Sequence, residues 1–387
     1  MRRSPFFVRI IGIGILLHFY VGFRIIPDLA VDAPVKWLAA LWLVLSVLLI
    51  PMGMLARTIK KQPLGDRLAW IGLLAMGFFS SLLVLTFVRD LLLASLLTID
   101  AIRPGSIPLA SWRTGSAAAV PLLALLSTAI GFFNARRRAR VVSIDVPIAD
   151  LPDALDGFTI VQISDIHVGP TIKRRYVDAI VDAVNRLKPD LIAVTGDVVD
   201  GSVLQLSAHT QPLSRLSARH GAYLVTGNHE YYAGAHAWID EFRRLGLTVL
   251  LNEHVVVDHD GARAIIAGVT DYSAAHFDPE HRSDPAASLV GAPGDVLIRV
   301  LLAHQPRSAE AAAEAGFTLQ LSGHTHGGQF FPWNFFVRFQ QPFVAGLARL
   351  NGLWVYTSRG TGYWGPPKRL GAPSEITRLR LVSGDAG

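Results

Sequence analysis

Long uninterrupted runs of apolar residues dominate the first third of the chain, and shorter β-branched runs dominate the remainder. Four of the long runs are predicted to be transmembrane helices, because each approaches the roughly 20 residues that a helix needs to cross the hydrocarbon core. These runs are residues 10–26, 37–55, 68–88 and 117–133. Behind the third run, Arg89 and Asp90 precede a further apolar stretch that ends at Leu97. That stretch either extends the helix around a neutralised pair or lies in the membrane interface.

The first run has an alternative interpretation as a signal peptide, because Arg2 and Arg3 precede it and residues 31–33 form a passable cleavage site. Three further apolar runs follow it, so we favour an uncleaved first helix in a multi-pass protein of the cell membrane. The positive-inside rule then places both chain ends, and the C-terminal domain with them, in the cytoplasm. The cations that carry this prediction are Arg2, Arg3, Arg57, Lys60, Lys61, Arg67, Arg136, Arg137, Arg138 and Arg140.

Charge divides the chain at the same place as hydropathy. The first 140 residues contain 16 Lys and Arg against 5 Asp and Glu, whereas the remaining residues contain 20 against 25. The basic charge therefore belongs to a membrane anchor region, residues 1–140, and we expect no nucleic-acid partner for the domain at 141–387. Residues 136–140 either contact anionic membrane lipids or act only as a stop-transfer signal. The chain has no cysteine, which excludes disulfides, thiolate metal sites and a cysteine nucleophile.

The most informative stretch of the second domain is the apolar run that starts at Leu191. It is predicted to be a buried strand of a parallel sheet, and it runs into Gly196 and Asp197. In open α/β sheets, ligands bind beyond the carboxyl ends of the strands, where Asp197 would lie. Burying an ionised aspartate costs several kcal/mol unless a cation meets it, so a metal ion is the simplest partner. We expect Asp200 to support this loop through hydrogen bonds.

Asp165 and His167 follow another predicted strand, residues 158–163. Residues two apart in an extended segment point the same way, so this carboxylate and imidazole can reach one ion. Such a pair taken alone more often caps a loop. A predicted helix at 173–187 leads to the next strand, and a right-handed connection places Asp165 and Asp197 at the same edge of the sheet.

Three further predicted strands end in residues of the same kind. Asn228 and His229 follow residues 222–226, His304 follows 296–303, and His324 and His326 follow 317–321. A turn would explain Asn228 and His229 taken alone. Because other predicted strands also end in potential metal ligands, we favour a metal site. Asp271 is better explained as a turn residue than as a pocket residue. The other histidines of this domain are predicted to be surface groups: His209, His220, His236, His254, His259, His276 and His281.

The motifs D-x-H, G-D-x-x-D, G-N-H-E, H-x-P and G-H-T-H occur in this order. From Gly157 to the C-terminus the chain therefore resembles the calcineurin-like metallophosphoesterase superfamily. The motif G-H-T-H-G-G-Q and residues 357–367 resemble bacterial membrane-associated phosphodiesterases that include a UDP-diacylglucosamine hydrolase. The N-terminal region with its four predicted transmembrane helices resembles the branch of the superfamily called transmembrane protein with metallophosphoesterase domain.

The resemblance implies an α/β fold, a four-layer αββα sandwich, preceded by the four-helix transmembrane region. We expect residues 352–358 and 375–382 to be closing strands of its second sheet. The resemblance also implies two divalent metal ions, one held by Asp165, His167 and His326, the other by Asn228, His304 and His324, with Asp197 shared. Oxygen and imidazole ligands without thiolate suit Mn, Fe, Zn or Ni.

The implied reaction is hydrolysis of a phosphodiester or pyrophosphate bond, with His229 as the acid that protonates the leaving oxygen. Glu230, where many relatives have aspartate, would orient His229. Arg359 would either contact phosphate or be structural. A membrane anchor favours a lipid-linked or nucleotide-linked phosphoester substrate. A membrane-tethered protein phosphatase and a non-catalytic metal-binding sensor or scaffold are the alternatives, and the complete ligand set favours an enzyme.

Overall fold

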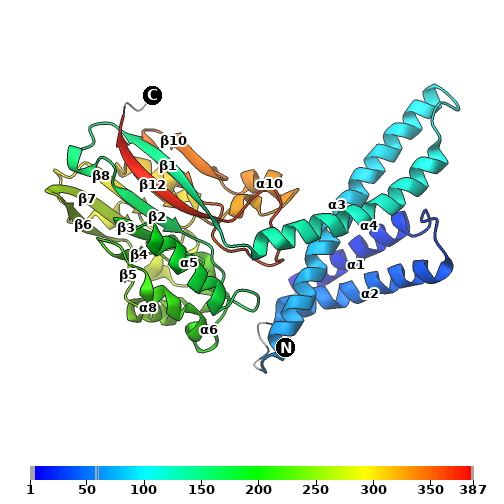
Figure 1. The fold of residues 1–387 in the computed structure, drawn as a ribbon, viewed down its shortest axis with the longest axis horizontal. Helices are drawn as coiled ribbons and strands as arrows, with labels where there is room; N and C mark the ends of the chain where they lie inside the picture. Colours follow the sequence, from blue (N-terminus) through cyan, green and yellow to red (C-terminus); the bar gives the residue numbers. More distant parts are fainter. Residues whose placement is uncertain (1–4, 57–58, 60, 385–387) are drawn as a thin grey trace. The chain divides into compact units, whose positions relative to one another are not determined.

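The computed structural model describes residues 5–56, 59 and 61–384 (Figure 1). The chain forms two compact units, Met1–Phe133 with Gly365–Lys368, and Asn134–Trp364 with Arg369–Gly387. We call them the helical unit and the catalytic unit. Four cations used to predict membrane orientation, Arg2, Arg3, Arg57 and Lys60, lie outside the described residues.

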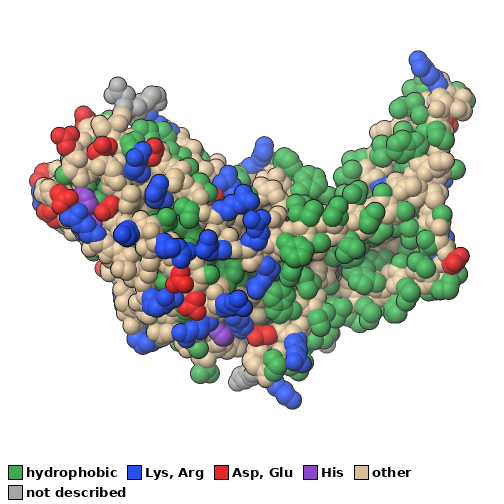
Figure 2. All heavy atoms as spheres, viewed as in Figure 1, with side chains coloured by type: hydrophobic (Ala, Val, Ile, Leu, Met, Phe, Trp, Pro, Cys, Tyr) green, Lys and Arg blue, Asp and Glu red, His purple; other side chains and the backbone are tan. Residues whose placement is uncertain are grey.

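All four predicted apolar runs are helical. The helices are α1 (Pro5–Ile25), α2 (Ala33–Leu55), α3 (Leu64–Ile102) and α4 (Leu109–Arg136). Three of them, α2, α3 and α4, are long and apolar enough to cross a membrane, whereas the apolar part of α1 within the described residues, Ile11–Ile25, is shorter. Hydrophobic side chains cover much of the visible surface of this unit (Figure 2). These helices anchor the protein in a membrane.

Helix α3 continues without a break through Arg89 and Asp90, which decides between the two alternatives for the stretch behind the third run. Partners on other segments neutralise both charges. Asp90 accepts hydrogen bonds from Arg24, 2.9 Å from its Nε, and from the Tyr20 hydroxyl at 2.7 Å. Arg89 is buried and pairs with Asp28. Paired charges are tolerated where an isolated charge is not, so the helix can run on to Ile102.

The catalytic unit contains two mixed six-stranded sheets. The first has the order β1 (Arg140–Ile148), β12 (Glu375–Ser383), β2 (Thr159–Ile163), β3 (Leu191–Val194), β4 (Ala222–Leu224), β5 (Thr248–Val249). The second has the order β10 (Gly346–Leu350), β11 (Leu353–Thr357), β9 (Leu319–Ser322), β8 (Ile298–Leu302), β7 (Ala262–Gly268), β6 (Glu253–His259). Strands β2 to β5 run parallel, as do β7, β8 and β9.

One expectation about the C-terminus is wrong. Strand β11 belongs to the second sheet as expected, but β12 lies in the first sheet, parallel to β1 and antiparallel to β2. The reason is that β1 is an edge strand whose backbone groups need a partner, and β12 supplies one along its whole length. A pairing between residues more than 200 positions apart leaves no local signal in the sequence.

Buried apolar residues fill three separate layers around the sheets. Between the sheets, Ile160 and Leu191 share one core with Ile266 and Leu319. On the other face of the first sheet lie the helices α5 (Arg174–Arg186), α6 (Val203–Thr210) and α8 (Ala235–Arg244), which share a second core with it (Figure 1). Helix α9 (Ala309–Glu314) shares a third core with the second sheet. The central strands β2, β3, β8 and β9 are thus buried on both faces, which explains their continuous apolar runs in the sequence.

Candidate metal centre

The predicted ligands lie in loops at the carboxyl ends of five strands. Asp165 and His167 follow β2, Asp197 follows β3, Asn228 follows β4, His304 follows β8, and His324 and His326 follow β9. Because β2, β3 and β4 are parallel, their carboxyl ends meet at one edge of the first sheet, and those of β8 and β9 meet at one edge of the second. The two edges face each other, so the site draws on both sheets.

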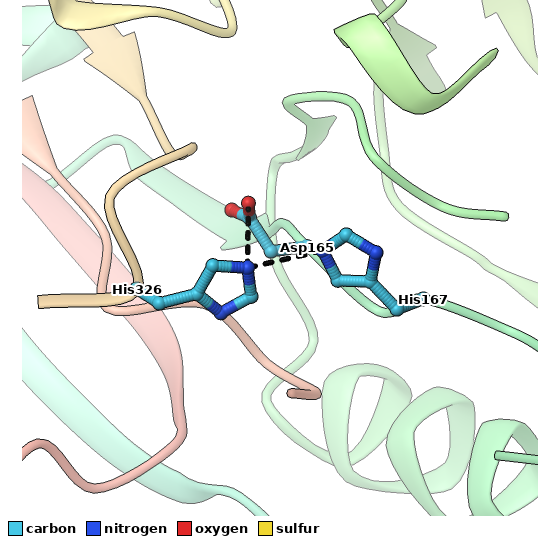
Figure 3. Close-up of side chains that lie close together, drawn as sticks. All are labelled: Asp165, His167 and His326. Atoms are coloured by element: carbon cyan, nitrogen blue, oxygen red, sulfur yellow. Dashed lines mark hydrogen bonds and ion pairs between the residues drawn. The ribbon is translucent and has the colours of Figure 1, made fainter. Parts of the chain in front are cut away.

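The structure brings six of these side chains into two groups. In each group the ligand atoms lie within 4.8 Å of one another: Asp165, His167 and His326 in the first (Figure 3), and Asp197, His304 and His324 in the second. In the first, His326 Nε2 is 3.4 Å from Asp165 Oδ1 and 3.0 Å from His167 Nε2.

Asp197 lies between the two groups. Its Oδ2 is 3.2 Å from Nε2 of His304 in the second group and 3.9 Å from Nε2 of His167 in the first. A single carboxylate that faces both sets of imidazoles is placed to serve two cations at once. Its other oxygen, Oδ1, accepts a hydrogen bond from the backbone N–H of His229 at 2.9 Å, which fixes its orientation.

The chemistry of these residues fits divalent metal ions. The Oδ1 of Asn228 is buried and accepts no hydrogen bond from any described residue, although buried polar atoms are normally satisfied. Burial and the charge of His304 lower the pKa of His324 to about 3, and burial with the charge of Arg369 lowers the pKa of His326. Both imidazoles are therefore neutral, which is the form that binds metals. A set of carboxylate, amide and imidazole donors accommodates Mn, Fe, Zn or Ni.

An unusual backbone conformation aims these side chains. Asp165, His167, Asp197, His324 and His326 all have φ between 51° and 70°, in the left-handed region. Residues other than glycine rarely adopt it, and each such residue costs about 1–3 kcal/mol, which contacts with the surrounding structure must offset. Five strained residues in one site indicate that the loops are shaped for ligand geometry rather than for stability.

Comparison with known proteins agrees with this geometry. A family model described as calcineurin-like phosphoesterase matches residues 158–328, which include all seven predicted ligands. A transmembrane protein with metallophosphoesterase domain from Danio rerio is 35% identical over 329 residues, covering 81% of this chain and 74% of the relative. The chain belongs to the calcineurin-like phosphoesterase family.

Other family members match over similar lengths. The transmembrane protein with metallophosphoesterase domain from Bos taurus is 38% identical over 299 residues, covering 70% of this chain and 67% of the relative. A metallophosphoesterase from Helicobacter pylori is 35% identical over 257 residues, covering 65% of this chain and 66% of the relative. The predicted family is therefore confirmed.

His229 of this phosphoesterase is held beside the predicted metal ligands by Asp200. The Nδ1 atom of His229 lies 2.5 Å from Asp200 Oδ1, and Nδ1 of His167 lies 3.1 Å from the same oxygen. Asp200 thus has a supporting role, although its partners are two imidazoles rather than the loop. Burial disfavours the charged form of His229, but the carboxylates of Asp197 and Asp200 outweigh it and raise its pKa to about 9. These two carboxylates therefore favour the protonated form of His229.

The expected role of Glu230 is wrong. Its carboxylate accepts hydrogen bonds from the backbone N–H groups of Asp197 at 2.9 Å, Val198 at 2.7 Å and Gly227 at 2.7 Å. Glu230 therefore ties the loop after β3 to the loop after β4. The reason is that it lies in the first turn of α7 (Asn228–Ala233), where neighbouring side chains point about 100° apart. The orienting bond to His229 comes from Asp200.

Two other polar residues of the domain, Asp271 and Arg359, have structural roles. Asp271 accepts hydrogen bonds from Ser273 and Gln305 and is a turn residue, as favoured. Arg359 pairs with Glu375 at 2.9 Å, which supports its structural alternative.

Arg369 contacts a predicted metal ligand. Its side chain is only 1% exposed, donates to the carbonyl of His326 at 3.0 Å and lies 2.9 Å from the Nδ1 of that histidine. Arg369 lies in a segment with no recognisable motif, so nothing in the sequence points to this contact.

The histidines predicted to be surface groups lie outside the two groups of ligands. His236 and His281 form a partly exposed cluster with Asp278. One of the predictions needs correction, because His259 is buried. Its ring packs against Phe158, with 4.9 Å between centroids, and its Nδ1 lies 2.9 Å from Nε2 of His220.

Gly323 leaves room for the first ligand. A Cβ atom at this position would lie 2.2 Å from Asp165 Oδ2 and 2.0 Å from Ser164 Oγ. We expect Gly323→Ala to displace the Asp165 carboxylate and weaken metal binding by about 10–100-fold, as for a change beside a metal ligand. Metal titration of the purified chain measures this. Gly294→Ala is the matched control, because nothing lies within 4 Å of its Cβ position. Equal metal affinity of the two variants would contradict the assignment of Asp165.

Asp200→Asn tests the orientation of His229. The neutral amide keeps the size of Asp200 but removes the charge that holds two imidazoles in place. We expect kcat at saturating metal to fall about 10–100-fold with little change in KM, and metal affinity to weaken as well, because Asp200 also holds the predicted ligand His167. Steady-state kinetics together with elemental analysis separate these effects. Asp145→Asn is the control variant. It also removes the charge of a paired aspartate, because Asp145 pairs with Arg380, but on the surface of the protein. A variant Asp200→Asn with parental kcat would contradict the positioning role.

Proposed function

We propose that this phosphoesterase is a membrane-anchored hydrolase of phosphodiester or pyrophosphate bonds with a two-metal centre. The ligands would be Asp165, His167 and His326 for one ion and Asn228, His304 and His324 for the other, with Asp197 shared. The position of Asp197 between the two groups is the observation that carries the proposal. Two divalent ions supply, when bound, activation of water and stabilisation of charge on the phosphoryl group.

His229 would act as the general acid of the reaction. Because Asp200 occupies its Nδ1, the proton available for transfer is the one on Nε2. A protonated His229 beside the metal ligands can donate that proton to the leaving oxygen, so that the product departs as a neutral alcohol or a protonated phosphate. General acid catalysis of this kind contributes about 10²–10⁴-fold.

Aromatic rings flank His229 on the outside of the site. The ring centroid of Tyr232 lies 5.1 Å from that of His229, and the ring centroid of Trp364 lies 5.8 Å from it. Both rings are about half-exposed and offer apolar walls to a substrate that carries more than a bare phosphate. Together with the membrane anchor, they favour a lipid-linked or nucleotide-linked phosphoester.

Placement in the membrane forms part of the proposal. We infer that α1 crosses the membrane together with α2, α3 and α4, and that the excess of Lys and Arg holds the catalytic unit in the cytoplasm. Anchoring confines enzyme and an amphiphilic substrate to one plane, which raises their encounter rate. The catalytic unit would then act on lipids or lipid-linked nucleotides of the inner leaflet.

Two chromogenic substrates test the reaction class. The full chain, purified in detergent and supplied with Mn²⁺, is expected to hydrolyse bis-p-nitrophenyl phosphate faster than p-nitrophenyl phosphate. Preference for the monoester would instead indicate a phosphatase. No hydrolysis of either ester by a chain that holds two ions would indicate a sensor or scaffold. Once diesterase activity is established, incubation with a membrane lipid extract and analysis of the released phosphate compounds would identify the substrate class.

A further inference from the structure

An exposed cluster of aromatic residues follows the last metal-ligand motif. We call residues 331–339 the aromatic segment; it contains α10 (Trp333–Phe336) and a 3₁₀ turn, Val337–Phe339. Five of its nine residues are aromatic: Phe331, Trp333, Phe335, Phe336 and Phe339. These five side chains are between 47% and 79% exposed. Large apolar groups clustered on a surface normally mark an interaction site.

The rings of the aromatic segment pack mainly on one another. The ring centroids of Phe331 and Phe335 are 5.9 Å apart, those of Trp333 and Phe336 are 6.0 Å apart, and those of Phe336 and Phe339 are 6.4 Å apart. Their outer faces remain open to solvent. The segment is therefore a surface feature of the catalytic unit and not a part of its cores.

Close packing fixes the segment to the metal centre. Gly328, two residues after His326, lies so near α10 that a Cβ atom there would be 2.1 Å from Cα of Asn334. Gly328 has φ 76°, and the chain turns back between His326 and the aromatic segment. The rings are thus held on a rigid support beside one of the predicted metal ligands.

The composition of the segment matches the interface of a bilayer. Arg338 is its only charged residue, and it has no carboxylate. Trp and Phe rings favour the boundary between lipid headgroups and acyl chains, and a cation beside them favours anionic lipids. This combination distinguishes the segment from the charged surface of the rest of the catalytic unit.

Chain connectivity keeps the segment within reach of a membrane. Helix α4 ends at Arg136 and β1 begins at Arg140. A link of this length spans at most roughly 14 Å, so the catalytic unit cannot move far from the membrane in which α4 is anchored. A second copy of the chain is a poorer occupant, because five half-exposed aromatic side chains offer roughly 500 Å². A stable protein interface needs about 800 Å² from each partner.

We propose that the aromatic segment inserts into the interface of the bilayer and docks the metal centre against it. The occupant of this surface is thus a lipid bilayer that contains anionic headgroups. The docking stands independently of the proposed function. Its consequence rests on that function: the substrate is a phosphoester that enters from the plane of the membrane, with its phosphoryl group at headgroup depth.

The absence of cysteine from the chain allows a direct test of the depth of the segment. Single variants Phe335→Cys and Phe339→Cys of the full chain are labelled with a nitroxide and reconstituted in vesicles of phosphatidylcholine and phosphatidylglycerol. Leu204→Cys is the matched control, because Leu204 is a large apolar residue on α6 that is 94% exposed. Collision of each label with oxygen, which concentrates in lipid, is compared with collision with a water-soluble nickel chelate.

We expect the labels at 335 and 339 to collide several-fold more with oxygen and several-fold less with the nickel chelate than the label at 204. Labels at 335 and 339 as accessible to nickel as the label at 204 would overturn the proposal. Spin–spin broadening that grows with the protein-to-lipid ratio would also overturn it, in favour of a second copy of the chain.

The consequence for the substrate has a separate readout. In the double variant Phe335→Ser/Phe339→Ser, we expect the rate on a phosphodiester lipid in vesicles, divided by the rate on bis-p-nitrophenyl phosphate, to fall about tenfold, the equivalent of roughly 1.4 kcal/mol of lost docking. An unchanged ratio would overturn entry from the membrane plane. Failure of the parental chain to hydrolyse bis-p-nitrophenyl phosphate would refute the proposed function, and the nitroxide measurement would still decide the docking.

Discussion

Asp197→Asn is expected to remove both metal ions and to lower kcat/KM by about a thousandfold or more, comparable to the loss of a principal electrostatic group from an active site. The side chain stands between two groups of ligands, with Oδ2 at 3.2 Å from His304 and 3.9 Å from His167. Asparagine keeps the shape but loses the negative charge that compensates two cations. It also presents an N–H₂ group in place of one ligand oxygen.

Elemental analysis of the purified variant measures the result, with two ions per chain expected for the parent and fewer than one for Asp197→Asn. Asp145→Asn is a suitable control, because Asp145 also holds a charged partner, Arg380 at 2.8 Å, but lies on the surface outside the centre. Retention of two ions by the Asp197 variant would refute the bridging role while leaving the family assignment intact.

Parallel strands explain why so much of the metal centre can be predicted from the sequence. Each apolar run that ends in Asp165, Asp197 or His304 is buried on both faces, and the carboxyl ends of parallel strands must meet at one edge. The residues that follow each strand can thus be read from the local sequence, while the general rule for parallel strands predicts that these residues lie close together. The family motifs add the order in which the ends occur.

The parts that could not be predicted depend on contacts between distant residues. The bond from His229 to Asp200 joins two loops, and the bond from Arg369 to His326 joins a motif to an unremarkable segment. The left-handed backbone of Asp165 has no signature of its own, because aspartate is compatible with many conformations. The expected pairing of Glu230 with His229 is wrong, since adjacency in sequence does not give the direction of a side chain on a helix.

The membrane part shows a similar division between local and distant information. Hydropathy gives helices at all four apolar runs, but it cannot show how far α3 extends, because Arg89 and Asp90 appear unfavourable in isolation. Their partners, Asp28 and Arg24, lie more than 60 positions away. Buried charges in a membrane helix therefore need a structure before a boundary can be drawn.

His229→Ala is expected to retain both metal ions and the fold but to lower kcat on a phosphodiester with an alkoxide leaving group by about 10²–10⁴-fold. The imidazole is held by Asp200, and the carboxylates of Asp197 and Asp200 favour its protonated form, so its removal takes away a proton donor rather than a ligand. Elemental analysis and thermal unfolding should match the parent. His276→Ala is the control, since His276 is an exposed histidine of the same unit.

A series of phosphodiesters whose leaving groups differ in pKa distinguishes an acid from a residue that only binds phosphate. A leaving group of low pKa, such as p-nitrophenolate, departs without protonation, so His229→Ala should hydrolyse it with a modest deficit. An alkoxide needs the proton, and the deficit should grow steadily as the leaving-group pKa rises. A deficit that is the same for every leaving group would show that His229 binds the phosphoryl group without donating a proton, and the acid would have to be sought elsewhere in the site.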